Sequence, residues 1–312
     1  FITILMQHKK KVILIAGPTA SGKSKLAIKL AKHVNGEIVN ADSMQVYKEI
    51  CILTSRPNIQ DEKIIKHHLY GFRSVKKNYS TGLWVENVVK NIKQIWKKGK
   101  IPIIVGGTGL YFKALTDGLS KIPNIPSTIR DSTRKLHKKI GQNNFFKRLL
   151  KLDPSCKKFV LSTDPQRSMR AYEVKKFTNK SLSKFMKKTK PKLKKSTFVK
   201  LFINFPRDLL NKNIEKRVKI MFHKGAVEEV KKFKKMKIKK DLPASKIIGV
   251  REIEDYLIGK ITLSKSQELI KQRTRQYAKR QFTWARGHMK SWEMIYSANI
   301  DDLYKKAINK IS

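Results

Sequence analysis

Short apolar runs separated by amphipathic segments dominate the first third of the chain. Runs rich in β-branched residues predict buried strands at 12–16 and 101–105, and shorter runs predict strands at 37–42 and 68–72. Between them, apolar residues recur with helical spacing after residue 23 and again after Ser80, a residue type that caps helices. Strands that alternate with helices predict an α/β fold with a parallel sheet flanked by helices.

The pattern changes at Asp117-Gly118, where the hydrophobic strands stop. Residues 127–188 read as short helices, with helix starts at Asp153-Pro154 and Asp164-Pro165. A run of lysines and prolines at 187–195 predicts a mobile loop. We therefore predict an α/β core of residues 1–117 and 197–312, interrupted by an all-helical insertion of residues 118–196.

A strand pattern returns at 197–205, and further helices follow it. Pro206 predicts the first position of a helix that carries Arg217, and a second basic helix is expected at 226–236. Ser264 predicts the start of a long helix to about Arg286, in which basic residues are interleaved with aromatic ones. This mixture suits RNA, but an amphipathic helix with its aromatic residues in the core gives the same pattern. A strand at 292–296 and a helix at 300–311 are expected to follow.

The most specific local signal comes directly after the first strand, where the chain matches the P-loop motif G-x-x-x-x-G-K-[ST]. Glycines let the backbone approach a phosphate, and loop N–H groups with the helix N-terminus favour an anion. Lys23 adds a full positive charge, and the Ser24 hydroxyl is placed to ligate Mg²⁺. The candidate phosphate-binding residues are Gly17, Pro18, Thr19, Ala20, Ser21, Gly22, Lys23 and Ser24. The motif alone leaves open whether the polyphosphate belongs to a nucleotide.

Two other strand ends are expected at the same edge of the sheet, where ligands bind in parallel α/β folds. Asp42 follows the second strand and is a candidate Mg²⁺ ligand or general base, although a turn or helix-capping role is the simpler alternative. The strand at 101–105 runs into Gly106-Gly107-Thr108-Gly109, without the Asp of a Walker B strand. This departure argues against an ordinary ATPase or helicase. We expect these glycines to permit close approach of a ligand.

The charge balance is strongly positive, with 71 Lys and Arg against 23 Asp and Glu, a formal net charge of +48. This favours a polyanionic partner, with nucleic acid as the first candidate and an anionic membrane surface as the second. Lysines that only coat a solvated surface would give the same excess.

The remaining composition excludes several other classes of protein. The two cysteines, Cys51 and Cys156, are far apart and indicate neither a zinc site nor a disulfide framework, and we interpret the adjacent His67-His68 as structural. No apolar run approaches the roughly 20 residues of a membrane helix, and lysines follow the short apolar start, the reverse of a signal peptide. We expect a soluble cytoplasmic protein, with Met6 as a candidate initiator.

Six blocks in order carry a resemblance to one known family, the tRNA dimethylallyltransferases, also called tRNA isopentenyltransferases. They are GPTASGKS (17–24), NADSMQVYK (40–48), IPIIVGGTGLYFKAL (101–115), DPQRSMRAYEV (164–174), KIIGVRE (246–252) and RQYAKRQFTWAR (275–286). The resemblance spans about Val12 to Tyr296 and implies a P-loop core with a helical insertion. The segment 53–58 departs slightly from the usual Gly-Thr-Ala-Lys-Pro pattern, and no C-terminal zinc finger is present, as in bacterial members.

The resemblance implies transfer of a dimethylallyl group from dimethylallyl diphosphate to N6 of the adenosine 3′ of the anticodon, position 37, in tRNAs that read codons beginning with U. This would explain the missing Walker B aspartate, because the loop would hold a departing diphosphate and no phosphorus would be attacked. Lys23, the loop N–H groups and Mg²⁺ on Ser24 would stabilise the charge that grows on the diphosphate, with help from Thr19 and Arg217.

The same resemblance assigns roles at the acceptor side. Asp42 matches the general base for the amine proton, and Thr108 matches a contact to the reacting adenosine, which must leave the anticodon-loop stack. The implied catalytic residues are Asp42, Thr108 and Lys23. The implied partners are dimethylallyl diphosphate and the tRNA anticodon stem-loop, with no membrane, and we expect a monomer. The implied tRNA contacts are Asp42, Ser43, Met44, Gln45, Thr108, Arg130, Gln166, Arg167, Ser168, Met169, Arg170, Lys246, Gly249, Arg251, Lys279, Arg280, Gln281, Phe282, Trp284 and Arg286.

Three alternatives make different demands on the same residues. A P-loop kinase of small molecules would consume ATP and would not need tRNA. A prenyltransferase that acts on free adenine nucleotides would not need the insertion or the 280–286 segment. A non-catalytic RNA-binding protein with a relic P-loop would leave Lys23, Ser24 and Asp42 without a joint role.

Overall fold

The computed structural model describes residues 10–186, 189–239 and 242–311. The chain divides into two compact units: a core unit of Phe1–Thr116 and Leu193–Ser312, and an inserted unit of Asp117–Lys192. The expected insertion at 118–196 therefore compares with an observed unit that begins one residue earlier and ends four residues earlier.

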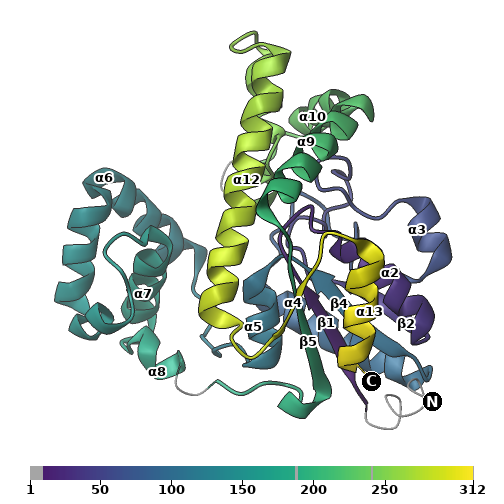
Figure 1. Cartoon of the computed structure of the whole chain (residues 1–312). Helices are drawn as coiled ribbons and strands as arrows, with labels where there is room; N and C mark the ends of the chain where they lie inside the picture. Colours follow the sequence, from purple (N-terminus) through teal and green to yellow (C-terminus); the bar gives the residue numbers. More distant parts are fainter. Residues whose placement is uncertain (1–9, 187–188, 240–241, 312) are drawn as a thin grey trace. The chain divides into compact units, whose positions relative to one another are not determined.

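A six-stranded parallel sheet forms the centre of the core unit, with strand order β3-β2-β4-β1-β5-β6 (Figure 1). The two central strands, β4 and β1, are apolar runs, as expected for a sheet covered on both faces. The predicted P-loop α/β class is confirmed, and the strands are β1 (Val12–Ala16), β2 (Gly36–Asn40), β3 (His67–His68), β4 (Ile101–Gly106), β5 (Phe198–Asn204) and β6 (Glu293–Tyr296).

The strand register brings three chain segments to one edge of the sheet. Ala16 at the end of β1 pairs with Gly106 of β4 on one side and with Phe202 of β5 on the other. Asn40 at the end of β2 pairs with Val105. The P-loop, the loop after β2 and the glycine-rich segment after β4 therefore leave the sheet side by side, as the sequence predicts.

Helices cover both faces of this sheet. Helix α2 (Lys23–His33) buries Leu26 and Leu30 and packs beside α13 (Ile300–Ile311) on one face. On the other face, α4 (Thr81–Lys97) packs against α5 (Gly109–Thr116). The predicted cap of α4 is confirmed, because the Ser80 hydroxyl accepts a hydrogen bond from the Leu83 N–H (3.3 Å).

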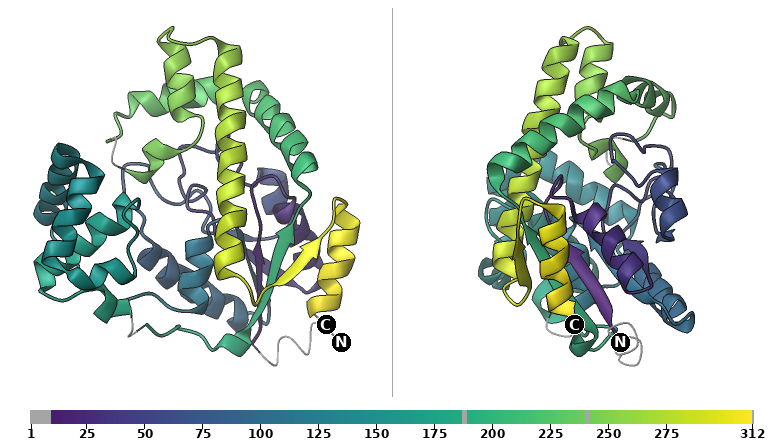
Figure 2. Two further views of the ribbon diagram at one scale, coloured as in Figure 1. Left: turned by 60° about the vertical axis from the view of Figure 1, so that its left-hand side comes forward. Right: turned by 45° about the vertical axis from the view of Figure 1, so that its right-hand side comes forward.

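The chain between β5 and β6 forms a helical layer that extends beyond the carboxyl edge of the sheet (Figure 2). The longest element is α12 (Leu263–His288), which packs against α9 (Arg207–His223), α11 (Val250–Leu257) and α5. Helix α10 (Ala226–Lys235) packs against α9 and α11. Helix α12 crosses the edge of the sheet where the three loops emerge. Its C-terminal half therefore faces the predicted site.

The inserted unit has a hydrophobic core of its own. Helix α6 (Ser127–Leu152) packs against α7 (Pro165–Thr178), and α8 (Leu182–Met186) packs beside α7. Phe145, Leu149 and Val174 are completely buried between them. The Asp164 side chain caps α7 by accepting from the Arg167 N–H (2.9 Å), and Pro165 occupies the first turn, as predicted.

Several predicted boundaries were wrong. The strand expected at 68–72 is only the two-residue β3, because Leu69 and Gly71 have left-handed backbones (φ 63° and 53°) that end the extended chain.

Helix α6 has 26 residues, although Gly141 (φ 72°) kinks it. Pro206 caps α9 instead of starting it, and α12 begins at Leu263, one residue before Ser264. Of the loop predicted at 187–195, residues 187–188 lie outside the described residues, and a short 3₁₀ helix covers Lys195–Thr197. The other short elements are α3 (Ile59–Ile64), Pro154–Lys158 and Pro243–Lys246.

Candidate active site

The P-loop wraps tightly between β1 and α2. Ala20 and Gly22 have left-handed backbones (φ 64° and 80°), and Gly22 caps α2 so that Lys23 is its first residue. The Ser21 hydroxyl oxygen is buried and has no hydrogen-bond partner among the residues that the structure describes. A buried hydroxyl of this kind costs free energy unless a ligand satisfies it. The loop therefore contains a buried hydroxyl, close to Gly17, that is available to a ligand.

Two cations lie beside this loop. The Lys23 ammonium donates to the Pro18 carbonyl (3.1 Å), and the Arg217 guanidinium of α9 donates to the Thr19 hydroxyl (3.0 Å) and the Thr54 carbonyl (3.4 Å). Burial lowers the pKa of Lys23 to about 8; the Asp42 carboxylate opposes this shift and Arg217 adds to it. Burial likewise lowers the pKa of Arg217, against the attraction of Asp42. One carboxylate close to two half-buried cations leaves an excess of positive charge, which suits a polyanion.

The buried side chain of Asn40 fixes the loop that carries Asp42. Asn40 accepts the Asp42 N–H (2.7 Å) and donates to the carbonyls of Asp42 (2.9 Å) and Leu69 (3.0 Å), and its own carbonyl accepts from the Trp84 indole (2.8 Å). One carboxylate oxygen of Asp42 accepts the Met44 N–H (2.9 Å). Asn40 was not among the residues predicted from the sequence, although it stands two residues before Asp42 in the same block.

Thr108 joins the loops after β2 and β4. Its hydroxyl oxygen accepts the Ser43 N–H (3.0 Å), and its N–H donates to the Ala41 carbonyl (3.2 Å). Thr108 therefore contacts the residues on either side of Asp42. Ser43 and Met44 are half-buried beside it, and Gln45 donates to the carbonyls of Thr54 and Ser55 (2.9 Å each).

The glycines at the end of β4 and just after it make room for other parts of the protein. A Cβ on Gly106 would lie 2.2 Å from the Ala41 carbonyl group, and one on Gly109 would lie 2.2 Å from the Trp284 indole. A Cβ on Gly107 would lie 2.1 Å from the Gln281 amide. These glycines therefore admit other parts of the protein. Gly107 and Gly109 also line the pocket described next, so close approach of a ligand to them stays a prediction.

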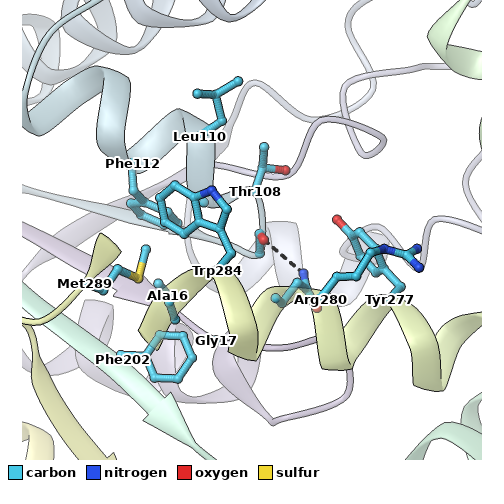
Figure 3. Close-up of a pocket in the computed structure, with 14 residues that line it drawn as sticks. Ala16, Gly17, Thr108, Leu110, Phe112, Phe202, Tyr277, Arg280, Trp284 and Met289 are labelled. Atoms are coloured by element: carbon cyan, nitrogen blue, oxygen red, sulfur yellow. Dashed lines mark hydrogen bonds between the residues drawn. The ribbon is translucent and has the colours of Figure 1, made fainter. Parts of the chain in front are cut away.

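A pocket of about 210 Å³ opens between these loops and α12 (Figure 3). Phe112, Phe202 and Met289 lie at its apolar end, Trp284 stands in the middle, and Tyr277 and Arg280 lie together at the other end. Gly17 and Thr108 also line it, so the pocket adjoins both the P-loop and the Asp42 loop. Its walls suit an apolar or flat aromatic group next to a bound polyphosphate.

Tyr277 is a residue of this pocket that the sequence analysis missed. Burial raises the pKa of its phenol, as does the nearby Asp42 carboxylate, whereas hydrogen bonds with Thr108 and Gln281 act in the opposite direction. The phenol therefore stays protonated beside Asp42 at neutral pH. The available signal was its spacing, because Tyr277 lies one helical turn before Gln281 on the same face.

The other implied tRNA contacts on α12 divide into two groups. Lys279, Arg280 and Arg286 are exposed, and Arg280 lies over the Tyr277 ring at 5.7 Å. Phe282 instead packs edge-on against Phe202 of β5 (5.9 Å). Gln281 is buried, and half-buried Trp284 stacks on His288 (4.4 Å). The helix thus combines the two arrangements that its sequence left open, with basic residues outside and several aromatic or amide side chains inside.

The 246–251 turn lies between a short 3₁₀ helix and α11. Lys246 and Arg251 are exposed, whereas Gly249 is buried with a left-handed backbone (φ 105°) and donates its N–H to Glu252 (2.8 Å). Gly249 therefore shapes this turn, and the two basic side chains present charge to solvent.

The implied contacts in the inserted unit are similarly mixed. Gln166 and Arg167 are exposed, and Met169 and Arg170 are half-buried, with Arg170 near Glu173 (3.5 Å). Ser168 is completely buried and donates to the Asp164 carbonyl (2.7 Å), so its side chain does not lie on the surface. Half-buried Arg130, on α6, donates to Asn124 (3.1 Å).

Other site types find little support in the part of the chain that the structure describes. No three His, Cys, Asp or Glu side chains there come together in a way that could hold a metal ion. The two cysteines are free, one exposed and one buried. His68 contacts Glu37 (2.7 Å) between β3 and β2, in agreement with a structural role. None of the described helices has both the length and the apolar character of a membrane span.

The fold and these loops define a class: a P-loop α/β protein that places a carboxylate and an apolar pocket beside its phosphate loop, with no Walker B aspartate. Comparison with known proteins identifies the family within this class. Residues 45–288 match the family model described as IPP transferase. The tRNA dimethylallyltransferase of Pelagibacter ubique is 52% identical over 301 residues, which cover 96% of each chain, and that of Bartonella henselae is 43% identical over 92% of this chain and 99% of its own. The chain therefore belongs to the IPP transferase family, and its predicted membership of the tRNA dimethylallyltransferases is confirmed.

Solved structures show the same architecture. A full-length tRNA isopentenylpyrophosphate transferase from Bacillus halodurans is 28% identical and covers 97% of both chains, with a TM-score of 0.68. A eukaryotic dimethylallyltransferase whose structures describe it acting on tRNA is 29% identical, with a TM-score of 0.82 over 96% of this chain and 77% of its own.

Proposed function

We propose that this protein transfers the dimethylallyl group of dimethylallyl diphosphate to N6 of the adenosine at position 37, 3′ of the anticodon, in tRNAs that read codons beginning with U. The product is N6-(dimethylallyl)adenosine. The observation that carries the proposal is similarity to tRNA dimethylallyltransferases over nearly the whole chain, together with a P-loop that adjoins a carboxylate and an apolar pocket.

The donor diphosphate would lie in the P-loop. Its oxygens would accept from loop N–H groups, from Lys23 and from Arg217. Two buried groups support this assignment, because Ser21 Oγ and Arg217 Nε have no partner among the described residues. A bound diphosphate offers the acceptors that both groups need, so it would remove a desolvation cost that the free protein carries.

The donor set also fits Mg²⁺. Ser24 is exposed on the first turn of α2, and Asp42 lies near Lys23. Mg²⁺ prefers oxygen ligands and is commonly held by one or two protein oxygens together with substrate phosphates. We propose that Ser24 holds the ion, which would neutralise charge on the departing diphosphate.

The reaction forms one bond and breaks another. The N6 nitrogen attacks the allylic carbon, the bond from that carbon to the diphosphate oxygen breaks, and diphosphate leaves with the electron pair. Lys23 and the loop N–H groups stabilise the charge that develops on it. The proton lost from N6 passes to the second carboxylate oxygen of Asp42, while the first stays bonded to the Met44 N–H. Thr108 positions the adenosine, and the pocket beside Trp284 receives the reacting groups, with the base displaced from its stack.

The exposed basic residues of each unit would bind the tRNA backbone. In the core unit these are Lys246, Arg251, Lys279, Arg280 and Arg286, and in the inserted unit Arg167 with the half-buried Arg130 and Arg170. We propose that the protein acts as a monomer. Because tRNA is the substrate, we propose that the protein acts in the cytoplasm.

Incubation with radiolabelled dimethylallyl diphosphate tests the proposal, with tRNA, AMP and ATP offered in separate reactions. Label should enter tRNA alone, and nuclease digestion should place it on one adenosine. Label in AMP or ATP would instead indicate a prenyltransferase of free nucleotides. Consumption of ATP with the prenyl donor untouched would identify a kinase and refute the proposal.

A further inference from the structure

Gln281 of α12 connects two loops that are distant in sequence. Its carbonyl oxygen accepts the Thr19 N–H (2.8 Å), and its amide nitrogen donates to the Gly107 carbonyl (2.9 Å), the bond drawn as a dashed line in Figure 3. The first loop follows β1 and the second follows β4, which are neighbouring strands. The buried amide therefore spans the edge of the sheet at the site.

The surroundings are fitted to this side chain. Gly107 leaves the space that the Gln281 amide occupies, since a Cβ there would lie 2.1 Å from its nitrogen. On the P-loop side, Thr19 is held twice. Its N–H donates to Gln281, and its hydroxyl accepts a hydrogen bond from the Arg217 guanidinium (3.0 Å). On the other side, Gly107 precedes Thr108, which holds the Ser43 N–H (3.0 Å). One amide thus links the loop for the donor diphosphate to the turn for the acceptor adenosine.

The chemistry of the two bonds requires an amide. A glutamine side chain presents one acceptor and one donor, whereas an ionised glutamate only accepts and a methionine of similar length offers neither bond of useful strength. Both partners are main-chain groups at the end of a strand, so loss of the bridge leaves a buried N–H and a buried C=O unpaired.

We propose that Gln281 is a positioning residue, which holds the P-loop and the Gly107–Thr108 turn in register, and that it does not act as a tRNA contact. This inference rests on the proposed function, since it deepens the account of that site. It predicts that loss of the amide weakens diphosphate binding and slows transfer, while RNA affinity stays the same.

The experiment compares Gln281→Met with Gln276→Met, an exposed glutamine on the same helix. Calorimetry measures the Kd of inorganic pyrophosphate, filter binding measures the Kd of an anticodon stem-loop RNA, and steady-state assays separate kcat from KM. We expect Gln281→Met to raise the pyrophosphate Kd at least about tenfold and to lower kcat, because two hydrogen bonds to the loops are lost. The RNA Kd should stay within about twofold, and Gln276→Met should match the wild type.

Gln281→Glu provides a readout that a general packing defect would not change. At neutral pH its carboxylate places negative charge beside the diphosphate loop and faces the Gly107 carbonyl, so pyrophosphate should bind more weakly than to Gln281→Met. A protonated carboxyl offers both a donor and an acceptor, so its affinity should recover relative to the wild type as the pH falls toward about 5. This comparison remains informative if Gln281→Met fails to fold.

A large loss of RNA affinity with unchanged pyrophosphate affinity in Gln281→Met would make Gln281 an RNA contact and overturn the inference. Wild-type values for Gln281→Met, or absence of any recovery of Gln281→Glu at low pH, would also overturn it. Failure of the proposed function is distinguishable, because wild-type protein would then transfer no prenyl group to tRNA, whereas the pyrophosphate titrations need no transfer.

Discussion

Replacement of Gly106 by alanine should damage both stability and catalysis. Gly106 is the last residue of β4, and a Cβ there would lie 2.2 Å from both the carbonyl carbon and the carbonyl oxygen of Ala41. Ordinary contacts of a Cβ begin near 3.4 Å, so the segments around Gly106 and Ala41 must separate by more than an ångström. The atoms that the new Cβ meets belong to the main chain of Ala41, which directly follows β2, the neighbour of β4. Rotation of a side chain therefore cannot relieve the clash.

The cost follows from the bonds that this separation strains. They are the bond from the Ala41 N–H to Val105 (2.8 Å), from the Thr108 N–H to Ala41 (3.2 Å), and from the Ser43 N–H to Thr108 (3.0 Å). At roughly 1 kcal/mol for each bond and roughly 1–3 kcal/mol for the overpacking, the free energy of unfolding should fall by about 4–6 kcal/mol. Displacement of the Asp42 loop by about 1 Å should also lower turnover on the order of 10²-fold.

Urea denaturation at low temperature measures the first effect, and prenyl transfer to tRNA measures the second. Gly287→Ala is the matched control, since a Cβ there meets nothing within 4 Å on helix α12 and its backbone is not left-handed. That variant should gain up to about 1 kcal/mol, because alanine favours helix over glycine. An unfolding free energy of Gly106→Ala within about 1 kcal/mol of the wild type, with normal turnover, would refute the argument.

Three further predictions address charge at the site. Asp42→Asn should lower turnover on the order of 10²–10⁴-fold while pyrophosphate still binds; near-normal turnover would exclude Asp42 as the base. Because the Lys23 pKa lies at about 8 in the folded protein against 10.5 for an ordinary lysine, the unfolded chain binds more protons between these values, so stability should rise with pH across that window. Lys23→Met should abolish that rise and weaken pyrophosphate binding. Denaturation curves recorded from pH 7 to 11 give the free energy of unfolding at each pH, and the same dependence on pH in the variant and the wild type would contradict the prediction. RNA affinity should fall roughly 10²-fold between 50 and 200 mM salt if about five phosphates are contacted, and a flat profile in filter binding would mean that the +48 charge does not serve RNA.

The parts of the fold that the sequence predicted are those with local causes. The strands β1 and β4 are continuous apolar runs, and the P-loop is a motif of eight residues. Ser80 and Asp164 cap the helices that begin directly after them. The failed strand at 68–72 shows the limit of this approach. Apolar residues there suit a strand, but the left-handed backbone at Leu69 and Gly71 ends it, and nothing in the run itself indicates that.

Sequence motifs predict the candidate site residues, whereas the contacts that join them across long stretches of chain were not predicted. The roles of Gly107 and Gln281 depend on each other across 174 residues, so neither could be inferred from its own neighbourhood. Tyr277 was missed for the same reason, because its importance comes from Asp42 and Thr108, which belong to other elements. Asn40 was missed although it is near Asp42 in sequence, since burial of its side chain is what gives it a role.

The strand order has a consequence for synthesis of the protein. Strand β1 is completed early, but its partner on one side, β5, follows only after the entire inserted unit. At roughly 5–20 residues per second on a ribosome, residues 17–197 take about 10–40 s to synthesise. During that time β1 has an unpaired apolar edge, which is open to wrong partners. An insertion that closes its own hydrophobic core early removes one competitor for that edge, so its rapid folding would protect the nascent sheet from aggregation.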